Sequence, residues 1–141
     1  MKDIMLKIIG KQLSFDMEEV RLEFITEGQI YEEGKTLYLE YDESEFSGMP
    51  GCRTKLEFSE GQIKMSRLGE GIGVDTEIEF RKGKRYTGYY ETPFGAIEME
   101  VLTNEIENTL SIEGKGSVNI DYQISLKGLT EGRNRLNIEV M

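Results

Sequence analysis

Hydrophobic and polar residues alternate with a period of two along most of the chain, the pattern of strands that bury one face. Between residues 74 and 80, for example, Asp75, Glu77 and Glu79 separate the less polar positions. The same alternation recurs at residues 4–8, 20–26, 37–41, 52–58, 63–65, 86–90, 97–101, 106–112, 118–126 and 136–140. The pattern predicts about ten half-buried strands and an all-β fold.

Short segments that contain glycine separate these strands and predict tight hairpin turns, because glycine adopts positive φ without a steric penalty. Examples are Glu33-Gly34-Lys35, Lys82-Gly83-Lys84, Thr92-Pro93-Phe94-Gly95 and Glu131-Gly132-Arg133. Sequential strands joined by short connections favour a closed or nearly closed antiparallel up-and-down β-barrel, formed as one domain by residues 1–141. A two-sheet sandwich would also hide the apolar faces.

Arg67 shares the inward parity of Ile63 and Met65, so its guanidinium is predicted to lie inside the barrel or at its rim. A charge in that position must be paired or hydrogen-bonded. Arg67 is therefore either a clamp for an anionic ligand, since a guanidinium suits carboxylate or phosphate, or a structural residue that closes one end of the barrel.

Three tyrosines, Tyr41, Tyr90 and Tyr122, also fall on inward positions. Buried hydroxyls need partners, and these could be one another, trapped water or a ligand. Together with Arg67, these tyrosines are the candidate ligand-binding residues. Alternation alone does not say whether the interior is hollow or filled.

Charge and composition narrow the function classes. The chain has 17 basic and 27 acidic residues, a net charge of −10, so we expect neither nucleic acid nor an anionic membrane as a partner. It has no histidine, which removes the usual triads and most zinc sites, so we expect no catalytic residue, metal or cofactor. The single cysteine, Cys52, and the lack of an apolar stretch long enough to span a bilayer predict a cytoplasmic protein.

The order of several short motifs resembles that of the YwiB-like family, small bacterial proteins with a domain of unknown function. The motifs are a tyrosine-rich strand that ends at Glu40-Tyr41, a strand that contains Thr54, Arg67-Leu68-Gly69, Thr92-Pro93-Phe94-Gly95 and the strand with Asp121-Tyr122. The resemblance covers nearly the whole chain and implies a calycin-like barrel, similar in architecture to lipocalins and fatty-acid-binding proteins. It carries over no activity, and it suggests ligand binding by analogy alone.

Two functions remain open at this point. The first is a binding module that takes a small, anionic molecule inside the barrel. The second is a non-catalytic accessory or protein-interaction module that uses its acidic outer surface, as a homodimer or with another protein. Enzymatic activity is not expected, because the carboxylates on outward positions, such as Glu98 and Glu100, are solvated side chains.

Overall fold

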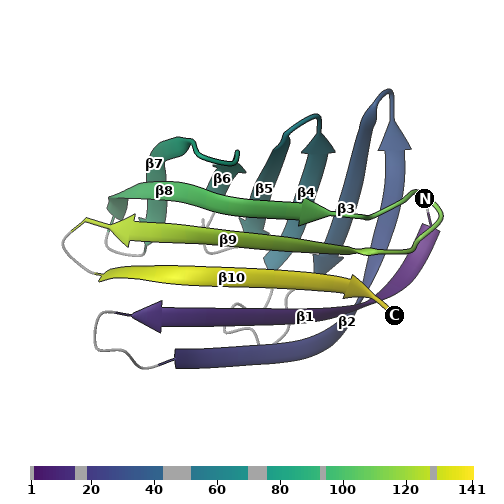
Figure 1. The fold of residues 1–141 in the computed structure, drawn as a ribbon, viewed down its shortest axis with the longest axis horizontal. Coiled ribbons are helices and arrows are strands. Elements are labelled where there is room, and N and C mark those ends of the chain that lie inside the picture. Colours follow the sequence, from purple (N-terminus) through teal and green to yellow (C-terminus); the bar gives the residue numbers. More distant parts are fainter. Residues whose placement is uncertain (1, 15–18, 43–51, 70–75, 93–94, 128–129) are drawn as a thin grey trace.

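The computed structural model describes residues 2–14, 19–42, 52–69, 76–92, 95–127 and 130–141. They form one ten-stranded antiparallel sheet in the order β6-β5-β4-β3-β2-β1-β10-β9-β8-β7 (Figure 1). Consecutive strands therefore pair with each other, except β6 and β7 at the two ends of the sheet, and β1 also pairs with β10, as in an up-and-down meander. The strands are β1 (Lys2–Ser14), β2 (Glu19–Glu33), β3 (Thr36–Asp42), β4 (Cys52–Ser59), β5 (Gln62–Gly69), β6 (Thr76–Phe80), β7 (Arg85–Thr92), β8 (Gly95–Asn108), β9 (Ser117–Leu126) and β10 (Thr130–Val140).

The sheet curls into a nearly closed barrel whose two end strands, β6 and β7, follow each other in the chain. The turn between them is tied to β8: the Gly83 amide donates to the Thr103 carbonyl at 2.8 Å, and the Thr103 amide donates to the Lys84 carbonyl at 3.3 Å. Gly83 has a φ of 74°, as the sequence predicts for this turn. These contacts hold the connection between the two end strands against β8, and the prediction of an all-β, nearly closed barrel is confirmed.

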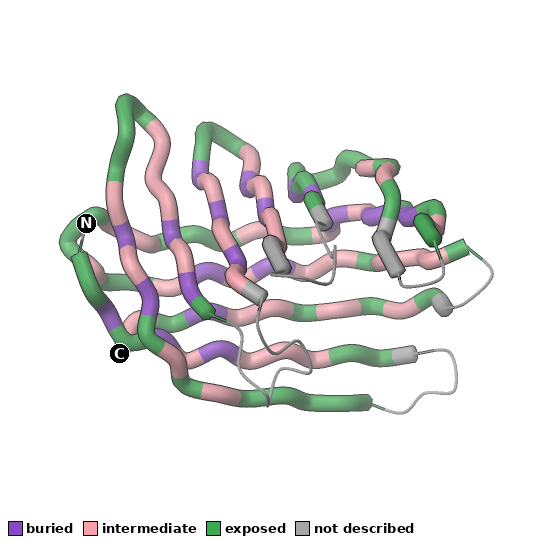
Figure 2. Tube along the Cα trace, turned by 180° about the vertical axis from the view of Figure 1, so that it is seen from behind, coloured by how far each residue is buried: buried purple, intermediate pink, exposed green. Residues whose placement is uncertain are grey.

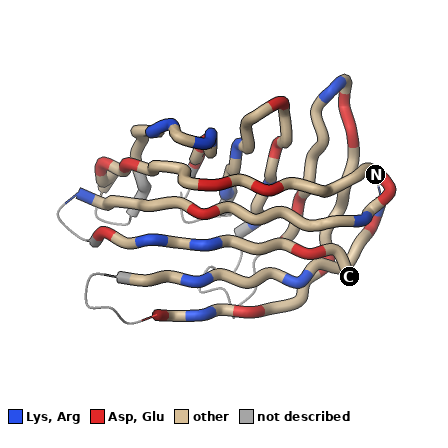
Figure 3. Tube along the Cα trace, viewed as in Figure 1, with Lys and Arg blue, Asp and Glu red and all other residues tan. Residues whose placement is uncertain are grey.

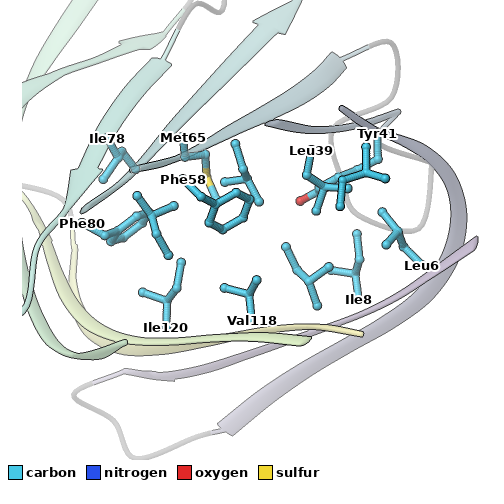
Figure 4. Packing of buried hydrophobic residues seen from close by; sticks show 14 of the residues in the cluster. Leu6, Ile8, Leu39, Tyr41, Phe58, Met65, Ile78, Phe80, Val118 and Ile120 are labelled. Carbon is cyan, nitrogen blue, oxygen red and sulfur yellow. The ribbon is translucent and has the colours of Figure 1, made fainter. Parts of the chain in front are cut away.

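The core lies between a layer of long strands and a layer of short ones (Figures 1 and 4). Leu6 and Ile8 of β1 and Ile120 of β9 face Leu39 and Phe58 of the short strands across the interior. Alternate residues on these strands are exposed or half-buried (Figure 2). The period-two pattern therefore gives the correct inner face for most strands.

Strand β2 joins the two layers. It pairs with β1 from Glu19 to Ile30 and with β3 only from Gly28 onward. At this junction the backbone comes so close to its neighbours that a Cβ on Gly28 would lie 2.7 Å from the Glu40 carbonyl oxygen. Gly28 therefore permits the passage of β2 from one layer to the other.

A β-bulge in β8 changes which residues face outward. Thr103 pairs with Tyr122 while Glu105 pairs with Asp121, so Asn104 is the additional residue. Before the bulge the odd-numbered residues Met99 and Val101 are buried, and after it Ile106 lies opposite Ile120. The bulge therefore turns Glu105 outward.

Three local expectations are wrong. Residues 106–112 do not form a strand of their own, because Ile106 belongs to β8, which ends at Asn108. The segment Glu131-Gly132-Arg133 is not a turn but part of β10, where Gly132 pairs with Ile124 of β9. Val20 and Leu22 have inward parity but are 52% and 42% exposed. Their part of β2 extends past the point where β3 pairs with it, so the opposite layer does not cover them. No helix in the described ranges is long and apolar enough to cross a membrane.

Candidate functional site

Arg67 lies on the inner face of β5, as predicted, in a row with two buried residues of the neighbouring strands. Thr54 pairs with both Tyr41 and Arg67, and the exposed fractions of Tyr41 and Thr54 are 1% and 0%. Arg67 is half-buried. Each of the three residues makes at least one polar, ionic or ring contact. The structure thus brings Arg67 and Tyr41 together inside the barrel, and their role in ligand binding stays a prediction.

Tyr122 also points inward, but its surroundings are those of a core residue. Its ring lies 4.9 Å from the ring of Phe80, which joins β9 to β6 across the interior. Its hydroxyl accepts a hydrogen bond from the Asn134 amide at 3.4 Å. The side chain of Tyr90 lies outside the described residues. The predicted set of Arg67, Tyr41, Tyr90 and Tyr122 is therefore placed only in part.

Two hollows on the described part of the molecule lie on the outer face of the long strands. One, of about 390 Å³, is lined by Arg85, Gln123 and Arg133 among others. The other, of about 510 Å³, extends over β2, β1, β10, β9 and β8, and we call it the polar hollow. Its volume falls within the range of small-molecule sites. Arg67, Tyr41 and Tyr122 line neither hollow.

A line of charged residues crosses the polar hollow from strand to strand. Lys11 of β1 is the direct partner of Arg21 on β2 and of Arg135 on β10. We call these three residues the cation row; all of them line the hollow. Directly opposite side chains on adjacent strands lie about 5 Å apart at Cβ, and like charges at that spacing repel. The row thus places three positive side chains side by side, while four carboxylates, Asp121, Glu105, Glu107 and Glu139, also line the hollow.

Asp121 continues the line on β9 and partly compensates the row. Its carboxylate accepts hydrogen bonds from Arg133 at 2.9 and 2.7 Å and lies 3.4 Å from the Arg135 guanidinium. The hydrogen bonds from Arg133 hold the pKa of Asp121 below its ordinary value. Arg21 has a carboxylate partner as well, Glu23 at 3.1 Å. Lys11 has no carboxylate within salt-bridge distance among the described residues.

The floor of the hollow carries a pair of amides. Asn137 of β10 pairs with Asn119 of β9, and its Nδ2 donates to the Asn119 Oδ1 at 2.5 Å. The Asn137 Oδ1 is buried and accepts no hydrogen bond in the described structure. A buried acceptor without a partner is costly, so a hydrogen-bond donor would be favoured at this point. No arrangement of three or more metal-ligating His, Cys, Asp or Glu side chains occurs in the described ranges.

The alternation pattern did not single out the cation row, although Lys11, Arg21 and Arg135 all have outward parity. Figure 3 shows several of the basic residues along β1, β10 and β2. The parity of a residue tells which face of the sheet its side chain is on. It does not tell which residue of the neighbouring strand lies opposite, because that depends on the register of the pairing. The usable signal is the concentration of basic residues on the outward positions of β1 and β10: Lys7, Lys11, Arg133 and Arg135.

The fold defines a small antiparallel barrel with a packed interior, and the known proteins agree with it. The chain belongs to the family described as "Domain of unknown function (DUF1934)", whose model matches residues 6–138. It is similar to the crystal structure of the ywiB protein from Bacillus subtilis, with a TM-score of 0.74 and 22% sequence identity over 99% of this chain and 93% of that one. At this identity the likeness shows the fold alone. No curated protein matches the chain.

Proposed function

We propose that the protein is a non-catalytic binding module that takes a small molecule with an anionic group in the polar hollow. The cation row carries this proposal. Lys11 is half-buried between two arginines and has no carboxylate of its own in the described structure. An anion above the row would replace repulsion between like charges with attraction to all three.

The geometry supports a ligand that also carries a hydrogen-bond donor. Asn137 lies diagonally across from Lys11, two residues beyond its direct partner Arg135 on the same face of β10. Diagonal neighbours on adjacent strands are about 7–8 Å apart, so one small molecule could reach both residues. A hydroxyl or an amine could donate to the Asn137 amide oxygen while a carboxylate or phosphate meets Lys11. Small hydroxy or amino acids and phosphorylated polyols fit this description.

The packed interior favours the outer face over the barrel lumen as the ligand site. Leu6, Leu39, Leu56, Met99 and Ile138 have no exposed surface and fill the space between the layers. A ligand in the lumen would have to displace such side chains, and each loses about 1.5–3 kcal/mol when it is exposed. The polar hollow requires no such rearrangement.

The proposal is tested by titrating ¹⁵N-labelled protein with inorganic phosphate and, separately, with citrate. We expect saturable shifts at residues of the cation row, with a dissociation constant of about 1 mM or tighter. Lys11→Gln should weaken binding about tenfold. Lys7→Gln is the matched control: Lys7 is on the same strand and the same face, but it already pairs with Glu23 at 3.1 Å.

Two results would overturn the proposal. One is the absence of saturable binding by either anion. The other is equal loss of binding in Lys7→Gln and Lys11→Gln, which would indicate a general effect of net charge. Saturable chemical-shift changes around Arg67 instead would place the ligand site inside the barrel.

A further inference from the structure

The N-terminal half of β2 forms a sheet edge. Residues 19–27 pair with β1, and pairing with β3 begins only at Gly28. Among the described strands, none pairs with residues 19–27 on the side away from β1. Figure 1 shows this part of β2 as the outermost strand of the front layer. Such an edge leaves alternate backbone N–H and C=O groups free to pair with another strand.

Exposed apolar side chains gather at this edge. Five of the eight large hydrophobic residues that are exposed in the described structure belong to β1 or β2. Val20, Leu22 and Ile25 of the edge itself are 52%, 42% and 55% exposed. An exposed apolar edge strand is a surface that soluble proteins normally cover or blunt.

We propose that this edge pairs with the same edge of a second copy of the chain, so that the two sheets become continuous across a two-fold axis. In an antiparallel pair centred on Leu22, Leu22 meets Leu22 of the partner subunit, and Val20 meets Phe24 of the partner subunit. On the outer face, Arg21 meets Glu23 of the partner subunit. The two-fold axis makes each of the last two contacts twice.

The charge pattern selects this register. A pair centred on Arg21 would place the two arginines opposite each other, and one centred on Glu23 would do the same with two glutamates. A pair centred on Phe24 would place Leu22 opposite Thr26. A pair centred on Val20 would place Arg21 opposite Glu19 but Leu22 opposite Glu18. Only even shifts keep inner-face residues opposite inner-face residues, so these four are the near alternatives. The register centred on Leu22 matches Leu22 with Leu22, Val20 with Phe24 and Arg21 with Glu23, and it leaves Ile25 opposite Glu19.

The experiment compares wild type with variants in which the charges at positions 21 and 23 are reversed. Sedimentation velocity gives the mass of each protein at concentrations from about 5 to 200 µM. Wild type should move from the 16.2 kDa monomer toward twice that mass as the concentration rises. Arg21→Glu and Glu23→Arg should each raise the dimer dissociation constant about tenfold or more, because each creates two like-charge contacts. The double variant R21E/E23R restores opposite charges and should restore the dimer.

Leu22→Lys tests the apolar centre of the interface, and Ile112→Lys is its control. Both side chains are similarly exposed, 42% for Leu22 and 45% for Ile112, but Ile112 lies between β8 and β9, away from the edge. Leu22→Lys should abolish the dimer, and Ile112→Lys should leave it intact. Circular dichroism verifies that each variant is folded.

A wild type that remains monomeric at 200 µM would overturn the proposal and indicate that Arg21 and Glu23 protect the edge from pairing. A dimer that neither charge reversal weakens, or that R21E/E23R fails to restore, would place the interface elsewhere. Mass does not depend on the polar hollow, so this test and the anion titration can fail independently. Leu22→Lys changes no residue that lines the hollow.

Discussion

The outer faces of the short and the long strands arrange their charges differently. On the short strands, Arg53 of β4 lies 3.1 Å from Glu40 and 2.7 Å from Asp42, and Lys64 of β5 lies 3.2 Å from Glu77. Arg53 also donates to Gln29. On the long strands, the cation row places three positive side chains on adjacent strands.

The short-strand face pairs these charges, whereas in the cation row Arg21 and Arg135 have carboxylates within 3.4 Å and Lys11 between them has none among the described residues. Glu40 illustrates the first case. Burial alone would raise its pKa, but hydrogen bonds from Tyr31 at 2.5 Å and from Arg53 bring the pKa below its ordinary value. Tyr31 in turn stacks on Tyr38 with ring centroids 5.0 Å apart. The charged groups of this cluster pair with one another, whereas Lys11 has no carboxylate partner among the described residues.

The largest effect is expected on the inner face, at Arg67. Because this half-buried side chain already makes at least one contact, we expect it to be structural, and Arg67→Met should lower the free energy of unfolding by about 3 kcal/mol. Urea denaturation measures this change. Unchanged or raised stability would instead indicate that Arg67 is held ready for an anionic ligand.

A smaller effect is expected at Arg53. Arg53→Met leaves Glu40 and Asp42 without their shared cation and should cost about 2 kcal/mol. Arg21→Met, the same type of change in the cation row, should cost less than about 0.5 kcal/mol. The two variants are compared in one urea series. Equal costs would remove the contrast between the two faces.

The alternation of the sequence is sufficient to predict the strands, the inner faces and the inward positions of Tyr41, Tyr122 and Arg67. It is not sufficient for the site, because a site on a sheet depends on which residues lie opposite each other. Leu13 pairs with Glu19 across the first hairpin; a shift of two residues would place Glu23 or Glu19 beside Lys11 and remove the cation row.

Neither the bulge nor the free edge can be predicted from the sequence alone, for related reasons. The additional residue at Asn104 is visible only as a change of inward parity between Thr103 and Ile106, which resembles the start of a new strand. The exposure of Val20 and Leu22 depends on where β3 stops covering β2. Both features come from the pairing of strands rather than from the residues of one strand.

Asp121 should make part of the free energy of unfolding depend on pH. Its pKa in the folded protein is below that of the unfolded chain, about 3.9, so its contribution is complete above that pH and is lost as the pH falls through the lower folded value. Asp121→Asn should cost about 1–2 kcal/mol at pH 7 and flatten the stability profile below pH 4. Urea unfolding from pH 2 to pH 7 measures this. A profile identical to that of wild type would contradict the role given to Asp121.

A small effect of the opposite sign is expected at Lys11 itself. Lys11→Gln removes repulsion from Arg21 and Arg135 and should stabilise the protein by about 0.5 kcal/mol at low salt, with the gain shrinking as salt is added. Thermal unfolding at about 10 mM and 500 mM NaCl gives both values. Destabilisation at low salt would mean that the row is compensated within the protein.

Anion binding at the cation row should be visible as an effect of phosphate on stability. At a dissociation constant of about 1 mM, 10 mM phosphate should raise the free energy of unfolding by about 1.4 kcal/mol over NaCl at equal ionic strength. Arg53→Met should keep this gain, and Lys11→Gln should lose most of it. The same gain in wild type and in Lys11→Gln would contradict the account.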